Sequence, residues 1–358
     1  VNSPINAREN KKELLLRLEK VAQAAEEFPF NQIAKIDGAK VGIVSSGIPY
    51  AHVKDALELL GLDTKVSLFK LGIVFPLPKQ KLLAFMKGLD KLIVVEKLEP
   101  IFEQELRALA FDENIKIEIH GKDLFPQAFE LYPELIVDRF ATFFDVKSPI
   151  AKIELEKILP APPRPPVLCA GCGHRNIYTA NKRVERRLKT RLIHSSDIGC
   201  YTLGFYEPLN AIDTCIAMGA SIGLANGYAK LDSRASLAFL GDSTFYHSGL
   251  SGLVNAILND NDIIVVIMDN GSTSMTGHQD HPGTGVRIDK TEGVRIDFIK
   301  FLTGLGLSRD QIWVPDSNNL DEMEFSFEQA IKTKGVRVII PTSMCSLLKV
   351  EDFKKKKT

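Results

Sequence analysis

The feature that most constrains the fold of this chain is a proline-rich segment, ILPAPPRPPV, at residues 158–167. Five of its ten residues are proline. Because proline lacks a backbone N–H and fixes φ, the segment can form neither a helix nor a central strand. We therefore predict a linker, at residues 151–167, between two domains. The chain has 358 residues, 45% of them hydrophobic, which is enough apolar material for two cores.

Before the linker, short apolar runs alternate with helical patterns. This alternation predicts a parallel sheet with crossover helices in a domain at residues 30–150. A helical lead-in is expected at residues 1–29, with its helix at 11–27. The expected strands are 41–46, 65–69, 91–96 and 115–119, and the expected helices lie near 50–60, 78–88 and 100–110.

A second alternating set follows the linker and predicts another parallel sheet, in a domain at residues 168–350. A basic tail at 351–358 ends the chain. The fold class expected is therefore α/β, with two parallel-sheet domains. The second domain should contain a helix after Arg175, a strand at 190–196, a helix around 215–229, a strand–helix–strand unit from SLAFL to IIVVIM, and a last strand at 335–341.

Composition excludes several classes of partner. Lys plus Arg and Asp plus Glu are equal at 45 each, so no net field favours nucleic acid or an anionic membrane. No apolar run reaches the roughly 18 residues of a membrane span, and no signal-peptide pattern begins the sequence. Five unevenly spaced cysteines do not form a secreted disulfide framework. We expect a cytoplasmic protein with small-molecule or protein partners.

Two short polar motifs follow the predicted strands SLAFL and IIVVIM, namely GDST at 241–244 and DNGS at 269–272. In an open parallel sheet, ligands bind beyond the carboxyl ends of the strands. Gly241 permits a tight turn, and a helix expected to begin near Ser248 favours phosphate through its free N–H groups. Asp242 and Asn270 offer oxygen ligands to Mg²⁺. The alternative is that Gly-Asp is an ordinary turn of an α/β fold.

The pair of motifs resembles the thiamine diphosphate motif, in which Gly-Asp-Gly is followed some 25 to 30 residues later by Asn-Asn. Ser243 stands in place of the last glycine and Asp269 in place of the first asparagine. The resemblance implies that Asp242, Asn270 and the main-chain oxygen of Ser272 bind magnesium. It also implies that Gly241, Ser243 and Thr244 contact the cofactor.

Longer segments resemble the α-subunit family of indolepyruvate:ferredoxin oxidoreductases. They are LCAGCGHR (168–175), DIGCYTLGFYEPLNAIDTCIAMGASIG (197–223), GDSTFYHSGLSGL (241–253) and MTGHQDHPGTG (275–285). Residues 30–145 resemble the transketolase C-terminal-like domain that precedes the thiamine diphosphate-binding domain in that family. The family's N-terminal pyrimidine-binding domain and C-terminal ferredoxin-like module have no counterpart in the sequence, so the chain is expected to be a fragment or a split subunit.

This resemblance implies a reaction and a set of partners. The reaction is oxidative decarboxylation of an aryl 2-oxoacid, such as indolepyruvate, to the acyl-CoA, with coenzyme A as co-substrate. The implied partners are ferredoxin, a pyrimidine-binding domain or subunit and a partner oxidoreductase subunit, in an oligomer. A non-oxidative thiamine diphosphate-dependent decarboxylase and a non-catalytic scaffold subunit remain alternatives.

Four of the five cysteines can be assembled into one site: Cys169 and Cys172 share a tight loop, Cys200 follows an expected strand and Cys345 follows the last strand. Thiolates are the usual ligands of iron–sulfur clusters. The pattern of these cysteines is similar to that of the four-iron (4Fe-4S) cluster beside the thiamine in related 2-oxoacid:ferredoxin oxidoreductases. Zinc and a metal-free thiol group are left open. Cys215 lies in an apolar run that predicts a core residue.

The segment SMTGHQ resembles a thiamine-proximal sequence of related enzymes. That resemblance implies that Met275, Thr276 and Gly277 lie close to the cofactor, and it favours His278 as a proton-transfer residue. A positioning or solvent-exposed role is the alternative for every histidine near this edge. The other histidines expected there are His174, His247 and His281.

Overall fold

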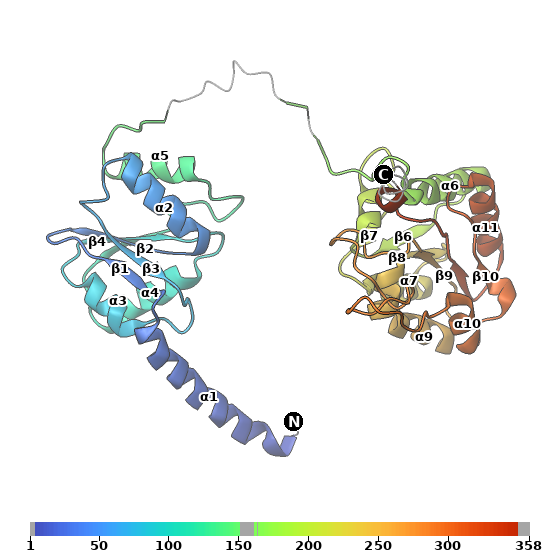
Figure 1. Ribbon diagram of the computed structural model, residues 1–358, viewed down its shortest axis with the longest axis horizontal. Helices are drawn as coiled ribbons and strands as arrows, with labels where there is room; N and C mark the ends of the chain where they lie inside the picture. Colours follow the sequence, from blue (N-terminus) through green and yellow to red (C-terminus); the bar gives the residue numbers. More distant parts are fainter. Residues whose placement is uncertain (1–3, 151–160, 163, 350–358) are drawn as a thin grey trace. The chain divides into compact units, whose positions relative to one another are not determined.

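The computed structural model describes residues 4–150, 161–162 and 164–349. The chain divides into two compact units, Val1–Pro160 and Ala161–Thr358 (Figure 1). The division falls inside the proline-rich segment. Most of the predicted linker, at 151–160 and 163, and the whole predicted basic tail lie outside the described residues. The finer domain limits drawn from the sequence stay predictions.

Unit 1 is built on a five-stranded sheet in the order β1-β3-β2-β4-β5, in which only β1 runs antiparallel. Its three central strands, β2, β3 and β4, are buried on both faces, which explains the continuous apolar runs of the sequence. The four predicted strands are confirmed, that at 41–46 with the predicted bounds and the other three with shifted ends, whereas β1 was not predicted. The strands are β1 Gln32–Ala34, β2 Val41–Ser46, β3 Ser67–Leu71, β4 Lys91–Val95 and β5 Glu118–His120.

The helices of unit 1 cover both faces of the sheet (Figure 1). One core lies under α2 and α5, and a second lies under α3 and α4. Helix α5 has no counterpart among the predicted elements. The helices are α1 Pro4–Glu27, α2 Gly47–Leu59, α3 Lys79–Met86, α4 Ile101–Asp112 and α5 Pro133–Phe143.

Unit 2 contains a six-stranded, wholly parallel sheet in the order β10-β11-β9-β8-β6-β7. Strands β8 and β9 lie side by side at its centre, and all of their residues are buried. The fold class is therefore α/β with two mostly parallel sheets, as the sequence predicts. The strands are β6 Ile193–Ser196, β7 Thr214–Cys215, β8 Ser236–Gly241, β9 Ile263–Met268, β10 Ile312–Trp313 and β11 Val336–Ile339.

Helices α6 and α11 pack on one face of this sheet, and α7, α9 and α10 pack on the other. Each layer therefore buries one face of the same strands, and the polar loops at the strand ends are left to form sites. The helices are α6 Gly173–Leu188, α7 Ala220–Leu231, α9 Leu250–Leu258, α10 Phe298–Gly304 and α11 Leu320–Lys332.

Two predicted helix limits in unit 2 are wrong. The helix after β8 begins at once, as α8 (Asp242–Thr244), and continues through a π-helical segment (Phe245–Gly249) into α9, so it does not begin near Ser248. The helix predicted at 215–229 begins at Ala220, after Gly219, whose φ of 86° suits glycine.

Cys215 lies in β7 instead of a helix, although it packs against the core as predicted. Among the described residues, no helix has the length and apolar character needed to cross a membrane.

The aromatic ring of Phe239 offers a test of the central sheet. This β8 residue is wholly buried, and its ring contacts that of Tyr178 edge-on at 5.1 Å between centroids. Phe239→Ala should lower the free energy of unfolding of unit 2 by about 3–5 kcal/mol because it leaves a cavity. Hydrogen exchange of the β8 and β9 amides measures this loss. Val254→Ala, at a position that is 48% exposed, should change it by less than about 0.5 kcal/mol.

Candidate cofactor and metal site

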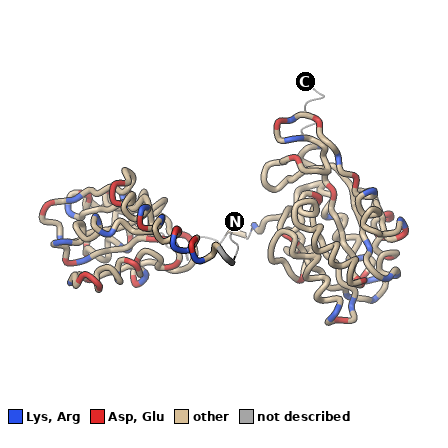
Figure 2. The backbone as a smooth tube through the Cα atoms, turned by 90° about the horizontal axis from the view of Figure 1, so that it is seen from below, with Lys and Arg blue, Asp and Glu red and all other residues tan. Residues whose placement is uncertain are grey.

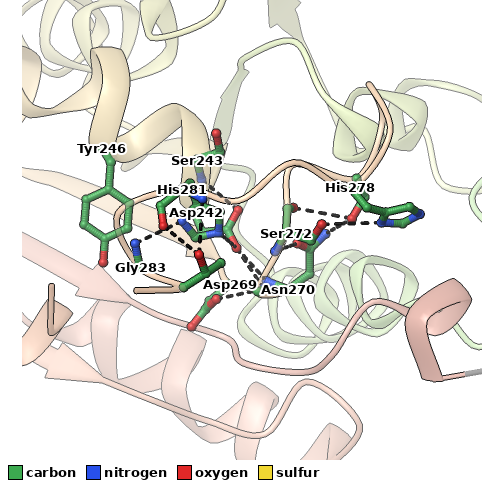
Figure 3. A network of polar contacts seen from close by, with 12 residues as sticks. Asp242, Ser243, Tyr246, Asp269, Asn270, Ser272, His278, His281 and Gly283 are labelled. Carbon is green, nitrogen blue, oxygen red and sulfur yellow. Dashed lines mark hydrogen bonds and ion pairs between the residues drawn. The ribbon is translucent and has the colours of Figure 1, made fainter. Parts of the chain in front are cut away.

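The two polar motifs meet at the carboxyl ends of β8 and β9. The register pairs Gly241 with Met268, so Asp242 and the residues after Met268 emerge at the same edge. The Oδ2 atom of Asp242 accepts hydrogen bonds from the backbone N–H groups of Asn270, at 3.1 Å, and Gly271, at 2.9 Å (Figure 3). One carboxylate thus joins the two loops.

Each predicted oxygen ligand keeps capacity for a cation. The Oδ1 atom of Asp242 accepts one hydrogen bond, from the N–H of Ser243 at 2.7 Å. The side-chain Oδ1 of Asn270 accepts one, from the N–H of Ser272 at 3.0 Å. The main-chain oxygen of Ser272 accepts a long hydrogen bond from the Ser274 hydroxyl, at 3.4 Å. Oxygens of this kind suit a hard cation.

The charges beside Asp242 set its protonation. Burial alone raises the pKa of the Asp242 carboxyl, but the contact with His281 and the N–H of Ser243 together bring that pKa below its ordinary value. The pKa of Asp269 is raised, first because the group is buried and second because the Asp242 carboxylate is close. Asp242 is therefore the member of this pair that ionises at the lower pH.

A pocket of about 520 Å³ of empty volume, part of it open to solvent, lies against this edge. Its walls combine the two motifs with apolar side chains such as Ile198, Met218 and Met268. Eight of the predicted cofactor-binding residues line it: Gly241, Asp242, Ser243, Thr244, Asn270, Ser272, Met275 and Thr276.

The structure does not bring Gly277 and His278 into the lining of this pocket. His278 has a positive φ of 62°, and its ring points away from Asp242 (Figure 3). Its Nδ1 lies 3.4 Å from the hydroxyl of Ser272, which lines the pocket. The proton-transfer role of His278 stays a prediction. The fourth histidine considered from the sequence, His247, is exposed and lines neither pocket described for this edge.

His174 and Tyr201 also line the pocket, although neither was predicted as a cofactor-binding residue. His174 is buried, and burial lowers its pKa to about 4, against the opposing effect of Asp242. Its ring is therefore neutral. Tyr201 was not predicted, because nothing in the sequence places an isolated tyrosine. Its hydroxyl donates to the carbonyl of Ile198 at 3.1 Å and lies 3.1 Å from the hydroxyl of Thr244.

The four cysteines predicted to act together line a second pocket, which adjoins the first. Cys200 and His174 border both pockets. The pKa of Cys200 is raised to about 11, chiefly by burial and then by the other three thiols, and the pKa of Cys172 is raised by burial. Among the described residues, no group of three or more His, Cys, Asp or Glu side chains is arranged to hold a single metal ion.

Two family models match the chain, one in each unit. A family model described as "Thiamine pyrophosphate enzyme, C-terminal TPP binding domain" matches residues 197–340, which include both motifs. A second, "Indolepyruvate oxidoreductase domain", matches residues 31–153. Indolepyruvate oxidoreductase subunit IorA of Pyrococcus horikoshii is 39% identical over 94% of this chain and 54% of its own length. IorA of Thermococcus kodakarensis is 36% identical over 99% of this chain and 57% of its own length.

The chain belongs to the IorA family. The family resemblance drawn from the sequence is therefore confirmed, and with it a relationship to thiamine pyrophosphate-dependent oxidoreductase subunits. The chain spans about half the length of the curated relatives it matches.

Among solved structures, a 2-oxoglutarate:ferredoxin oxidoreductase from Magnetococcus marinus matches 51% of this chain and 65% of that chain. The identity is 17% and the TM-score is 0.46, and this likeness adds nothing to the assignment. The thiamine pyrophosphate match in this IorA-family chain, residues 197–340, includes both polar motifs and Cys200 but not Cys169, Cys172 or Cys345.

The raised pKa values predict an order of thiol reactivity in the metal-free protein. Cys169 is exposed and should be alkylated first. At a pH near the ordinary thiol pKa of about 8.5, Cys200 should react about 100-fold more slowly than a thiol of that pKa, because little of it is thiolate. Peptide mass spectrometry after timed iodoacetamide treatment measures both rates. Equal labelling of the two cysteines would contradict the burial described for Cys200.

Proposed function

We propose that unit 2 binds the diphosphate of thiamine diphosphate through Mg²⁺, as part of a 2-oxoacid:ferredoxin oxidoreductase. The observation that carries the proposal is the meeting of Asp242 and Asn270 at one pocket edge, each with an oxygen that accepts a single hydrogen bond. The proposed magnesium ligands are Asp242, Asn270 and the main-chain oxygen of Ser272. This donor set of three oxygens fits a cation that completes its shell with phosphate oxygens.

The surrounding residues fit the rest of the cofactor's charged tail. The helical segment that begins at Asp242 presents the positive end of its dipole beside residues 241–244, which line the pocket. The Thr244 hydroxyl, held near that of Tyr201, offers a further polar contact. Ile198, Met218 and Met268 give the pocket an apolar wall on its other side.

Bound thiamine diphosphate supplies the carbon nucleophile and the electron sink for decarboxylation of a 2-oxoacid. The chain's own residues fix the charged end of the cofactor, and the neutral ring of His174 closes the wall toward the cysteines. As substrate we propose an aryl 2-oxoacid such as indolepyruvate, because the relatives carry that substrate in their name.

Coenzyme A as co-substrate, ferredoxin as acceptor, a partner oxidoreductase subunit and a pyrimidine-binding domain or subunit complete the proposal. We place the assembly in the cytoplasm, where thiols are kept reduced.

We further propose that Cys169, Cys172, Cys200 and Cys345 hold a 4Fe-4S cluster. All four line one pocket, and Cys200 also borders the cofactor pocket, so electrons would have a short path. A site of four thiolates also suits zinc, and metal analysis distinguishes the two.

Binding of the cofactor tests the first proposal. Calorimetry with thiamine diphosphate and Mg²⁺, on the chain alone and with its partner subunit, should show metal-dependent binding. Asn270→Ala keeps the backbone N–H bond to Asp242 but removes the amide oxygen. It should weaken binding by more than the 10- to 100-fold or so that outer-shell changes cost, because a direct ligand is lost.

The control is Asp289→Ala, which removes an exposed carboxylate in the same unit. Its affinity should match that of the wild type. Binding that Asn270→Ala leaves intact would contradict the assignment of the ligands.

Metal analysis tests the cluster. Anaerobically purified or reconstituted protein should contain iron and acid-labile sulfide in equal amounts, and Cys345→Ser should lose most of both because one thiolate ligand is removed. Cys215→Ser is the matched control, since Cys215 lies outside the cysteine pocket. Stoichiometric zinc without sulfide would instead show a zinc site.

A further inference from the structure

His281 is held in a fixed orientation beside the cofactor pocket. It is buried, and its Nδ1 accepts a hydrogen bond from the N–H of Gly283 at 3.1 Å. Its ring stacks on Tyr246, with 5.8 Å between centroids and 28° between planes. Tyr246 in turn stacks on Phe298 at 4.8 Å and donates its hydroxyl to the carbonyl of Ile296 at 2.9 Å. The imidazole is therefore fixed on one edge and on one face.

The hydrogen bond at Nδ1 determines where the ring proton lies. Because Nδ1 accepts from Gly283, Nε2 is the ring nitrogen that carries an N–H. Nε2 lies 3.1 Å from Oδ2 of Asp242, although among the described residues it makes no hydrogen bond of good geometry. His281 thus presents an N–H group to the carboxylate of Asp242.

This contact makes the two oxygens of Asp242 unequal. Three donors surround Oδ2, namely the N–H groups of Asn270 and Gly271 and the Nε2 of His281 (Figure 3). Oδ1 accepts a hydrogen bond from the N–H of Ser243, and the side chain of Asp269 also contacts the Asp242 carboxyl group. A carboxylate held in this way cannot rotate freely, and its less occupied oxygen is left for a metal ion.

We propose that His281 is a positioning residue that orients Asp242 so that Oδ1 faces the magnesium ion. This inference rests on the proposed function. It assigns to His281 the role of an outer-shell residue, one that holds a metal ligand in its orientation. The sequence alone did not separate His281 from the other histidines at this edge.

The same contact anchors the glycine-rich loop that follows β9. Met275 and Thr276 of this loop line the pocket, and His281 ties the loop's far end to Asp242. Gly283 is required for this packing, because a Cβ there would lie 2.8 Å from Cε2 of Tyr246 and 3.0 Å from Cε1 of His281. Orientation of the metal ligand and placement of the loop therefore depend on one side chain.

Two variants of His281 separate positioning from space filling. His281→Phe keeps an aromatic ring to stack on Tyr246 but removes both nitrogens. His281→Gln loses the ring but keeps an amide N–H within reach of Asp242. Calorimetric titration of Mg²⁺ into protein with saturating thiamine diphosphate should show about 10- to 100-fold weaker binding for His281→Phe, and substantial recovery for His281→Gln. His247→Phe, at the exposed position on the preceding helix, should bind as the wild type does.

Hydrogen exchange of the ligand-free chain provides a second measurement. The amides of Asn270 and Gly271 donate to the oxygen that His281 contacts, so both should exchange faster in His281→Phe, while the β9 amides keep their wild-type rates. Unchanged exchange in that variant would overturn the inference, as would unchanged Mg²⁺ affinity or an equal loss in both variants.

The exchange result does not depend on cofactor. If the wild-type chain with its partner subunit binds no thiamine diphosphate, the proposed function fails, and the exchange of the Asn270 and Gly271 amides still decides the role of His281.

Discussion

The site in unit 2 depends on the bond between one carboxylate and two backbone N–H groups across the end of a parallel sheet. Parallel strands bring their carboxyl ends to one edge but leave the loops there free to diverge. Asp242, at the end of β8, accepts from Asn270 and Gly271, at the end of β9, and so closes the gap between them. The buried centre of the sheet fixes where the two loops start, and this carboxylate fixes how they meet.

The cofactor pocket and the cysteine pocket lie at the same edge of the sheet and share lining residues. Figure 2 shows acidic and basic residues spread over the backbone of both units, in keeping with equal numbers of each in the sequence. His174 and Cys200 line both pockets. Each lies at the start of a different helical segment. Burial keeps His174 neutral and Cys200 protonated in the metal-free chain. The two pockets therefore share uncharged side chains at His174 and Cys200.

The sequence predicted the sheet, the meeting of the two motifs and the grouping of the four cysteines, because apolar periodicity and strand-end loops follow local rules. It did not predict where the helix after β8 begins. That start depends on the extended conformation of Gly241 and a π-helical segment, which no local pattern announces. It also favoured His278 over His281. The two residues are three positions apart, and only the positive φ of His278 and the Gly283 hydrogen bond to His281 determine which ring faces Asp242.

The departures from the thiamine diphosphate motif can be understood from the same contacts. Ser243 contributes its backbone N–H to Asp242, a role that any residue other than proline can fill. Asp269 stands where the motif has asparagine, and burial beside the ionised Asp242 raises its pKa. When protonated, a carboxyl group has one O–H donor and one carbonyl acceptor, and so resembles an amide in shape and hydrogen bonding. With its pKa raised to about 6, Asp269 takes up this form at a higher pH than an ordinary carboxyl, and Asp242 remains the carboxylate that is ionised at lower pH.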